Sequence, residues 1–306
     1  PADGAPDGRG SAGRRRRLTD KARGSPHQDA DGAWGDAGNR AQAAGARGGE
    51  DEIADGVDIR LWANAESRED VTDAHALGAA GVGLFRTEYL YLASTELPDE
   101  DTQFRAYRDA AIAMTGRTVT FRTVDLGADK ADRTGLALKD EPNPALGLRG
   151  VRLSLARAGL LRSQLRAIAR ASGYGPVRVL VPMVSGAEEM HAVAAALEAA
   201  ISELRAEGHA VADRIPLGAM IEVPSAALAL PSFIRGCDFL SIGTNDLVQY
   251  LLAADRTNEA LGALYTPLHP AVVRLLRDIA RTAARAGTPL SVCGEIAGDP
   301  LFVPML

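Results

Sequence analysis

The sequence contains little cysteine, and this shortage excludes several kinds of protein. Only two cysteines occur among the 306 residues, Cys237 and Cys293, and they are far apart and form no Cys-x-x-Cys pair. Such usage is typical of a reducing compartment and argues against both a disulfide framework and a zinc site built from cysteines. We therefore expect a cytoplasmic protein, whose hydrophobic content of 46% is enough to build a full core.

Long apolar runs and an excess of positive charge are also missing. No apolar run is long enough to cross a bilayer, and the amino-terminal region has no apolar signal core. Neither membrane insertion nor export is therefore expected. The formal net charge of −6 argues against a nucleic acid as the main partner.

The amino-terminal region also lacks hydrophobic periodicity. Gly, Ala, Asp and Arg dominate residues 1–52, with a basic run at Arg14–Arg17. That run fits a solvated arm better than a nucleic-acid or targeting element. We predict a disordered low-complexity arm over residues 1–52 and a folded domain over residues 53–306.

Short apolar runs alternate with longer amphipathic stretches in the second region. Helical faces are predicted over residues 104–114, 190–204 and 272–279. Ser185 and Glu188 have the spacing of a capping box, and Pro270 and Gly287 mark the start and stop of the last helix. The predicted strands are residues 59–63, 81–85, 119–121, 177–181, 217–221, 239–242 and 290–292.

Near-continuous apolar strands that alternate with helices predict an α/β protein with a parallel sheet covered by helices. The seven predicted strands suggest a (β/α)8 TIM-type barrel that lacks its last strand–helix unit, with an open edge between the first and seventh strands. A doubly wound open sheet is the alternative. No Gly-x-Gly-x-x-Gly follows the first predicted strand, which weakens a dinucleotide-binding version of that alternative.

Charged and polar residues follow several predicted strands where those strands end. They are Arg86 and Glu88, Arg122 and Asp125, Glu222, Asn245 and Asp246, Arg256, Cys293 and, in the loop after the third strand, Arg149. Each has an ordinary structural explanation. Arg86 could pair with Glu88 or a neighbouring carboxylate, Arg122 could pair with Asp125, and a residue of the Asn-Asp pair could cap a helix. In barrels of this kind, however, active groups sit at the carboxyl ends of strands, so we expect this set to converge.

The chemistry of the converging set favours an anionic substrate. Guanidinium groups bind phosphate and carboxylate in a bidentate manner. Two carboxylates with open coordination positions suit Mg²⁺, which shares its shell with phosphorylated substrates. A cysteine thiol can donate a proton. The set therefore predicts a site for a small phosphate ester with several negative charges, together with a metal and a proton donor.

Seven segments in order resemble the phosphoenolpyruvate-binding barrel of the phosphoenolpyruvate–protein phosphotransferases, enzyme I of the bacterial sugar phosphotransferase system. They are residues 81–90 (GVGLFRTEYL), 121–130 (FRTVDLGADK), 143–149 (NPALGLR), 220–225 (MIEVPS), 241–247 (SIGTNDL), 255–258 (DRTN) and 293–295 (CGE). Pyruvate phosphate dikinase and phosphoenolpyruvate synthase are relatives, but the second segment resembles the enzyme I version more than theirs.

The resemblance implies a role for each matching residue. Arg86 and Arg122 would hold the phosphoryl group, with help from Arg149. Arg256 would bind the phosphate or carboxylate end of the substrate, and Asn245 would bind its carboxylate. Glu222 and Asp246 would ligate Mg²⁺, which also brings Asp246 to the substrate. Cys293 would protonate C3 of the enolate to give pyruvate.

The resemblance also implies partners. The family passes the phosphoryl group to a histidine on a separate domain and then to the small carrier protein HPr, and the complete protein is expected to form a homodimer. Residues 1–50 show no phosphohistidine domain, and none of the five histidines, His27, His75, His191, His209 and His269, is expected to be held in line at the site. Two alternatives therefore stay open: the barrel domain of a dikinase or synthase relative, and a non-catalytic fragment that binds phosphoenolpyruvate.

Overall fold

The computed structural model describes residues 59–93, 96–127 and 141–302. The chain divides into the compact units Pro1–Asp36 and Ala37–Leu306, and the described residues all belong to the second. The predicted arm over residues 1–52, with His27, lies outside the described residues, as does the predicted domain boundary. Among the described residues, no helix is both long enough and apolar enough to cross a membrane.

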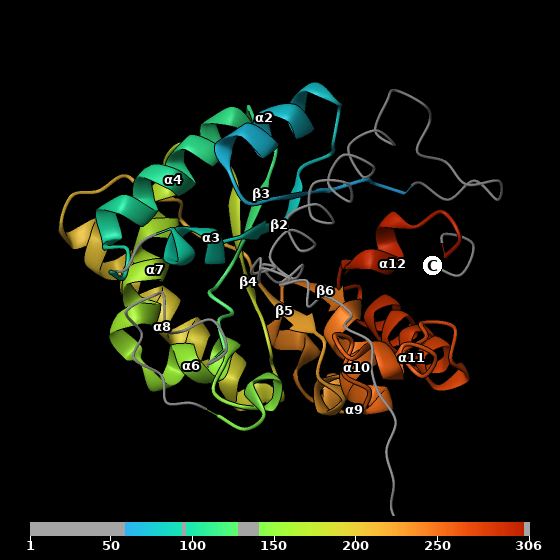
Figure 1. Ribbon diagram of the computed structural model, residues 1–306. Helices are drawn as coiled ribbons and strands as arrows, with labels where there is room; N and C mark the ends of the chain where they lie inside the picture. Colours follow the sequence, from blue (N-terminus) through green and yellow to red (C-terminus); the bar gives the residue numbers. More distant parts are fainter. Residues whose placement is uncertain (1–58, 94–95, 128–140, 303–306) are drawn as a thin grey trace, which may run out of the picture. The chain divides into compact units, whose positions relative to one another are not determined.

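A parallel sheet forms the centre of the described region (Figure 1). Its strands are β1 Ala63–Ala65, β2 Val82–Arg86, β3 Val119–Arg122, β4 Val177–Val181, β5 Leu217–Ile221, β6 Phe239–Gly243 and β7 Leu290–Cys293. They pair in chain order, from β1 to β7, and every pair is parallel. In a flat sheet β2 and β7 would be separated by five strand spacings, about 24 Å. They lie within contact distance of each other, so the sheet curls strongly.

The sequence located six strands to within one residue at either end and misplaced the first. The prediction at 59–63 is wrong because β1 begins only at Ala63, where the backbone pairs with Val82. Ile59 and Leu61 are 38% and 41% exposed, so apolar character did not mark a buried strand there. The described residues contain no pairing between β1 and β7, which agrees with the predicted open edge.

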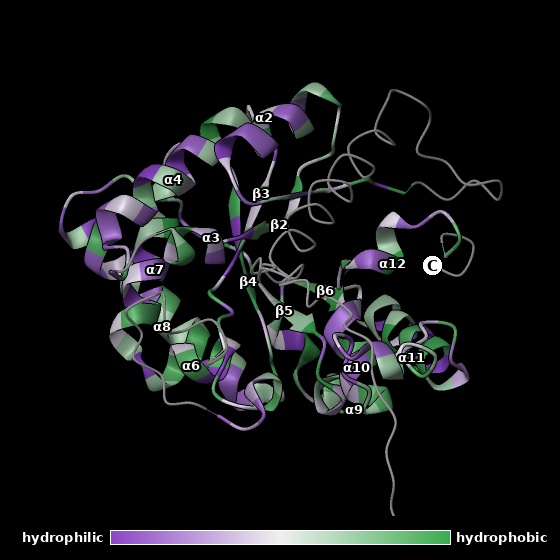
Figure 2. Ribbon diagram, in the orientation of Figure 1, coloured by the Kyte–Doolittle hydropathy of each residue, from purple (hydrophilic) through white to green (hydrophobic). Residues whose placement is uncertain are grey.

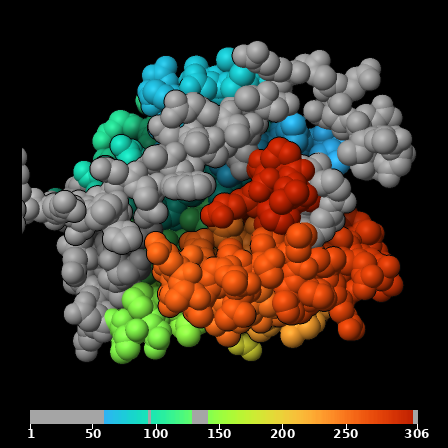
Figure 3. All heavy atoms as spheres, turned by 45° about the vertical axis from the view of Figure 1, so that its right-hand side comes forward, coloured from blue at the N-terminus to red at the C-terminus, as the bar shows by residue number. Residues whose placement is uncertain are grey.

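Helices alternate with the strands and lie outside the curled sheet (Figure 1). They are α2 Arg68–Ala76, α3 Glu88–Leu92, α4 Glu100–Ala113, α6 Gly150–Ala156, α7 Ala158–Ala171, α8 Ala187–Ala206, α9 Pro224–Phe233, α10 Thr244–Leu252, α11 Pro270–Ala286 and α12 Glu295–Gly298, with short 3₁₀ turns at Pro144–Leu146, Ile234–Gly236 and Glu259–Leu261. Figure 3 shows α10 and α11 in orange with α12 in red beside them.

The three predicted helical faces are confirmed in α4, α8 and α11, which bury apolar residues within the predicted ranges, among them Tyr107, Leu197 and Leu276. The predicted limits of α11 are also confirmed, because it starts at Pro270 and Gly287 caps its end. The capping box at Ser185 and Glu188 is wrong by one residue. Gly186 is the N-cap of α8, and the carboxylate of Glu189 accepts the backbone N–H groups of Ser185 and Gly186 at 2.5 and 3.2 Å.

Two apolar layers form on opposite faces of the sheet, and Figure 2 shows hydrophobic colour along the strands between them. The larger layer lies between sheet and helices and includes Val179, Phe85 and Tyr107; the two rings pack edge-on at 6.4 Å between centroids. The smaller layer joins Leu84, Leu180, Met220 and Phe239, which come from four different strands. Side chains from these strands meet only inside the curl, so the inner face is packed with side chains there.

A stacked arginine fills the inner face at the amino ends of the strands. The guanidinium of Arg178 lies 4.5 Å from the Trp62 ring and 4.2 Å from the Phe239 ring, and its Nε donates to Thr120 Oγ1 at 2.6 Å. Gly81 and Gly83 give the Trp62 side chain room, since a Cβ at Gly81 would collide with its ring and a Cβ at Gly83 with its Cβ. A cavity of about 520 Å³ opens at this end, lined in part by Arg178 and Phe239. It lies at the end of the sheet opposite to the predicted site.

Candidate anion and metal site at the carboxyl ends of the strands

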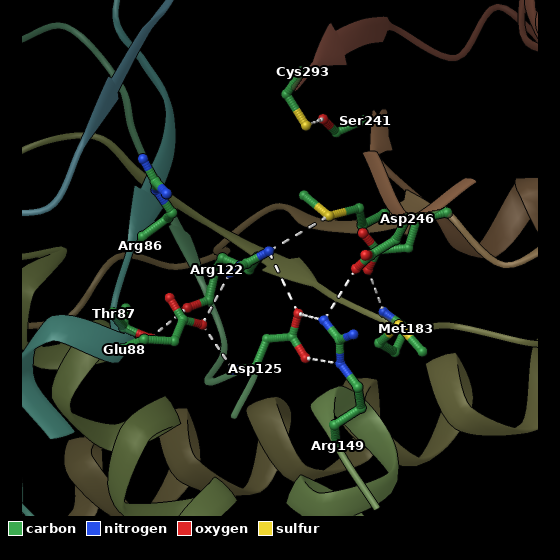
Figure 4. Close-up of polar contacts among 12 residues, drawn as sticks. Arg86, Thr87, Glu88, Arg122, Asp125, Arg149, Met183, Ser241, Asp246 and Cys293 are labelled. Carbon is green, nitrogen blue, oxygen red and sulfur yellow. Dashed lines mark hydrogen bonds and ion pairs between the residues drawn. The ribbon is translucent and has the colours of Figure 1, made fainter. Parts of the chain in front are cut away.

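The parallel strands carry the predicted site residues to one end of the sheet. Arg86, Arg122 and Cys293 are the last residues of β2, β3 and β7. Glu222 follows β5 directly, and Asp246 lies in the first turn of α10, directly after β6. Figure 4 shows that Arg122, Asp246 and Cys293 come from separate elements and face a shared space.

Arginines and carboxylates alternate through the middle of this site. Arg149 donates from Nε and Nη2 to the two oxygens of Asp125 at 3.0 and 2.8 Å, and Nη2 also contacts Asp246 Oδ2 at 3.0 Å. Arg122 lies 3.2 Å from Glu88 Oε1 and 3.6 Å from Asp125 Oδ2. We call the series Glu88–Arg122–Asp125–Arg149–Asp246 the charge chain (Figure 4). None of its side chains is more than 14% exposed, so these contacts are poorly screened by solvent.

Three carboxylates approach one another beside the charge chain. Asp125, Glu222 and Asp246 each offer an oxygen, and these oxygens lie within 4.8 Å of one another. We call them the acidic cluster. Burial, followed by repulsion from Asp246 and Asp125, raises the pKa of Glu222 to about 8. Such crowding is costly unless a cation balances it.

The acidic cluster fits a hard divalent cation. Its donors are all carboxylate oxygens, which Mg²⁺ prefers. Oδ1 of Asp246 is buried and accepts no hydrogen bond from the described residues, and Nη2 of Arg256 lies 3.9 Å from it. A buried carboxylate oxygen without a hydrogen-bond donor is rare unless an ion uses it. The residues present could therefore hold such a metal.

The backbone around Glu222 is shaped to hold its carboxylate. The N–H of Met183 donates to Glu222 Oε1 at 2.7 Å, and Met183 adopts a φ of +59°, in the left-handed region that a side chain disfavours. Such a backbone persists only where the surroundings enforce it, at a cost of about 1–3 kcal/mol. Gly243 lies opposite, where any Cβ would collide with the same carboxylate.

The thiol of Cys293 faces the inner side of the sheet near the arginines. It donates to the Ile242 carbonyl at 3.3 Å and accepts from the Ser241 hydroxyl at 3.5 Å. Burial raises the pKa of Cys293 to about 11 in spite of that Ser241 contact. The thiol is therefore protonated at neutral pH, as a proton donor must be.

Three predicted residues lie at the rim and outside the charge chain. Arg86 is 36% exposed, and its Nε lies 2.9 Å from Glu66 Oε1. Asn245 accepts the N–H of Glu295 at 3.1 Å and contacts that residue's carboxylate at 3.4 Å. The side chain of Arg256 is 39% exposed. Arg86 and Arg256 are thus more exposed than the two arginines of the charge chain, whose side chains are 14% exposed.

Of the three ordinary structural explanations given for these residues, the structure agrees with two and contradicts one. Arg86 does pair with a neighbouring carboxylate, but that carboxylate is Glu66, and Glu88 contacts Arg122 instead. The contact between Arg122 and Asp125 is confirmed at 3.6 Å. Helix capping by Asn245 or Asp246 is wrong, since Gly243 occupies the N-cap and neither side chain caps the helix.

Sequence reasoning missed several residues that shape the site. Asp125 stood in the strand-end set but only as a partner of Arg122, and its position three residues beyond a strand-end arginine was the available signal. Tyr250, whose hydroxyl accepts from Arg149 Nη1 at 3.1 Å, follows the Asn-Asp pair in a helix and carried no such signal. Met183 contacts Glu222, 39 residues away in the chain, and Gln164 contacts Val124, 40 residues away. No local sequence pattern reveals contacts over such separations.

An α/β protein with arginines, an acidic cluster and a protonated thiol at its strand ends has the kinds of donor that a small anion and a hard divalent cation require. Comparison with known sequences then identifies the family. Residues 40–306 match the family described as PEP-utilising enzyme, PEP-binding domain, and the chain belongs to that family.

Several relatives carry the name phosphoenolpyruvate-protein phosphotransferase. The protein from Cupriavidus necator is 52% identical over 254 residues, which covers 82% of this chain and 43% of the relative. The proteins from Geobacillus stearothermophilus and Staphylococcus aureus are 45% and 42% identical, over 83% and 82% of this chain and 44% of each relative. The chain thus spans less than half the length of these relatives.

Likeness to solved structures is weaker. An HpcH/HpaI aldolase/citrate lyase family protein from Burkholderia cenocepacia aligns over 85% of this chain and 86% of its own, with a TM-score of 0.47 and 13% identity.

Proposed function

We propose that this chain is the phosphoenolpyruvate-binding part of a phosphotransferase that moves a phosphoryl group from phosphoenolpyruvate to a protein histidine and releases pyruvate. The observation that carries the proposal is the meeting of buried arginines with the acidic cluster at one end of the sheet. The curled sheet suits a (β/α)8 TIM-type barrel that a further strand–helix unit would close.

Arg122 and Arg149 are the residues that we propose to hold the phosphoryl group in the interior of the site. Their guanidinium groups are fixed by carboxylates before any ligand arrives, which reduces the entropy lost on binding. Arg86 and Arg256 would close on the ligand from the rim, where solvent exposure leaves them room to move. The Asn245 amide would bind the carboxylate end.

Glu222 and Asp246 are the proposed ligands of Mg²⁺, and Asp125 stands beside them in the acidic cluster. The ion, when bound, would neutralise charge on the phosphoryl oxygens. The residues of this chain prepare for it. Met183 orients one oxygen of Glu222, and Arg149 bridges the two aspartates so that their carboxylates stay close in spite of repulsion.

The proposed reaction breaks the bond between phosphorus and the enol oxygen and forms a bond from phosphorus to a histidine nitrogen. The electron pair of the broken bond stays on the substrate oxygen as an enolate, and C3 then takes a proton from the Cys293 thiol to give pyruvate. The raised pKa of Cys293 keeps that proton available at neutral pH. The accepting histidine would belong to a separate domain, which then passes the phosphoryl group to an HPr-like carrier.

Calorimetry tests the binding part of this proposal. Phosphoenolpyruvate should bind the chain in Mg²⁺ and bind much more weakly in EDTA. Glu222→Gln should bind phosphoenolpyruvate weakly in both buffers, because an amide is a poor Mg²⁺ ligand. Equal affinity with and without Mg²⁺ would refute the metal assignment, and absence of binding in Mg²⁺ would refute the substrate.

A further inference from the structure

Side chains continue the hydrogen bonding of β3 beyond its last residue. The N–H of Thr123 still donates to the Leu180 carbonyl of β4, at 2.9 Å. The next N–H, of Val124, donates instead to Gln164 Oε1 at 2.9 Å, and that of Asp125 donates to Glu88 Oε1 at 2.7 Å. The backbone that carries Arg122 and Asp125 is therefore fixed by side chains from α7 and α3.

Gln164 is the centre of a buried polar network. Its Nε2 donates to the hydroxyls of Thr87 at 3.0 Å and Tyr107 at 3.2 Å, while its Oε1 accepts the N–H of Val124. All these side chains are fully buried, so an unmade hydrogen bond here would be costly. Because the N–H of Val124 needs an acceptor, the amide oxygen of Gln164 faces it, and the NH2 group of Gln164 points the other way.

The direction of the remaining bonds follows from this orientation. Because the Thr87 hydroxyl accepts from Gln164, its own hydrogen is free to donate, and it does so to the carbonyl of Arg122 at 2.9 Å. The Tyr107 hydroxyl likewise donates to Gln103 Oε1 at 3.2 Å. Gln164 thus holds the strand end twice, directly at Val124 and through Thr87 at Arg122.

We propose that Gln164 and Thr87 are positioning residues for the anion site, an inference that rests on the proposed function. Arg122 and Asp125 contact each other and lie in the middle of the charge chain. A shift of the backbone that carries them would therefore displace both an arginine and a carboxylate of the proposed site. Charge-assisted contacts depend steeply on geometry, and small misplacements far from the reacting atoms weaken function strongly.

A purely structural role predicts a different result, and the opposite end of β3 supplies the matched control. Thr120 is a fully buried threonine of β3, the strand whose other end carries Arg122. Its hydroxyl accepts from Arg178 Nε at 2.6 Å, away from the site. Thr120→Val and Thr87→Val both replace a bonded hydroxyl with a methyl group in a buried setting. Both substitutions should lower the melting temperature, but only Thr87→Val should lower the affinity for phosphoenolpyruvate.

The experiment compares phosphoenolpyruvate affinity in Mg²⁺, measured by calorimetry, with melting temperature for each variant. We expect Thr87→Val to bind about tenfold more weakly than the parent, the change that corresponds to one hydrogen bond. Thr87→Ser, which keeps the hydroxyl, should bind like the parent, and so should Thr120→Val. If Thr87→Val does not fold, Thr87→Ala replaces it with the same expectation.

Three outcomes would overturn the positioning role: parent-like affinity in Thr87→Val, equal losses of affinity in Thr87→Val and Thr120→Val, or failure of both Thr87→Val and Thr87→Ala to fold. The last would assign the network to folding alone. If the parent itself does not bind phosphoenolpyruvate, the proposed function fails instead, so the two failures are distinguishable.

Discussion

Replacing Arg122 with lysine gives a direct test of the charge chain. The substitution keeps the positive charge but replaces a planar fork with one ammonium group. Arg122 contacts Glu88 through Nη2 and Asp125 through Nη1, two different nitrogens on two sides of the guanidinium. An ammonium group cannot reproduce that geometry and hold an anionic ligand as well.

The expected magnitude follows from the hydrogen bond to the ligand that a lysine cannot make. One charge-assisted hydrogen bond contributes about 1.5–3 kcal/mol, so Arg122→Lys should weaken phosphoenolpyruvate binding by about tenfold to a hundredfold. The assay is calorimetric titration in Mg²⁺. Folding should be checked by melting temperature in the same buffer, because breaking a buried ion pair also lowers stability.

Arg166→Lys is the matched control for this measurement. The side chain of Arg166 is 7% exposed, against 14% for Arg122, and it bridges α4 and α8 through Glu100 and Glu203. That control should lower the melting temperature but leave the affinity unchanged. Parent-like affinity in Arg122→Lys, or an equal loss of affinity in both variants, would refute the reasoning and assign Arg122 to the scaffold.

Three further predictions concern other parts of the site. Cys293→Ala should bind phosphoenolpyruvate like the parent yet block pyruvate formation once a phosphohistidine domain is supplied; unchanged pyruvate release, measured with a coupled dehydrogenase, would exclude the thiol as proton donor. The carboxyl group of Glu222 has a folded-state pKa of about 8, above its unfolded value, so the folded state binds more protons between about pH 4.5 and 8. Without Mg²⁺ the free energy of unfolding should therefore fall as pH rises through that window, and denaturant titrations should show a smaller fall in Glu222→Gln; equal slopes would contradict the raised pKa. Incubation with Mg²⁺ and phosphoenolpyruvate should leave the histidines of the isolated chain unphosphorylated, since His75 and His191 lie in helices and Nδ1 of His269 accepts the Ala271 N–H. A phosphohistidine found by mass spectrometry would count against transfer to a separate domain.

Much of the fold could be predicted because buried parallel strands are short apolar runs, and six of them stood between amphipathic helices. β1 was misplaced because it contributes only Ala63 and Ala65 to the core, while the apolar residues before it are exposed. An alanine-rich strand at a sheet edge has too little hydrophobic contrast for the sequence to mark its position.

The site was predictable to the extent that strand ends define it. Arg122, Glu222 and Asp246 follow from position alone, since parallel strands all deliver their last residues to one end. The pairing among them was not predictable. Glu88 is two residues from Arg86 in the chain yet contacts Arg122, a choice that depends on side-chain direction in the curled sheet.

The alternation of charges has a consequence for selectivity. The charge chain holds two arginines against three carboxylates, so it carries an excess of one negative charge before Glu222 is counted. A monovalent anion such as chloride would add to that excess and bring nothing to offset it. A ligand that arrives with a divalent cation would offset it. We therefore expect the proposed site to reject small anions that come without a cation, because of its charge and without any steric barrier.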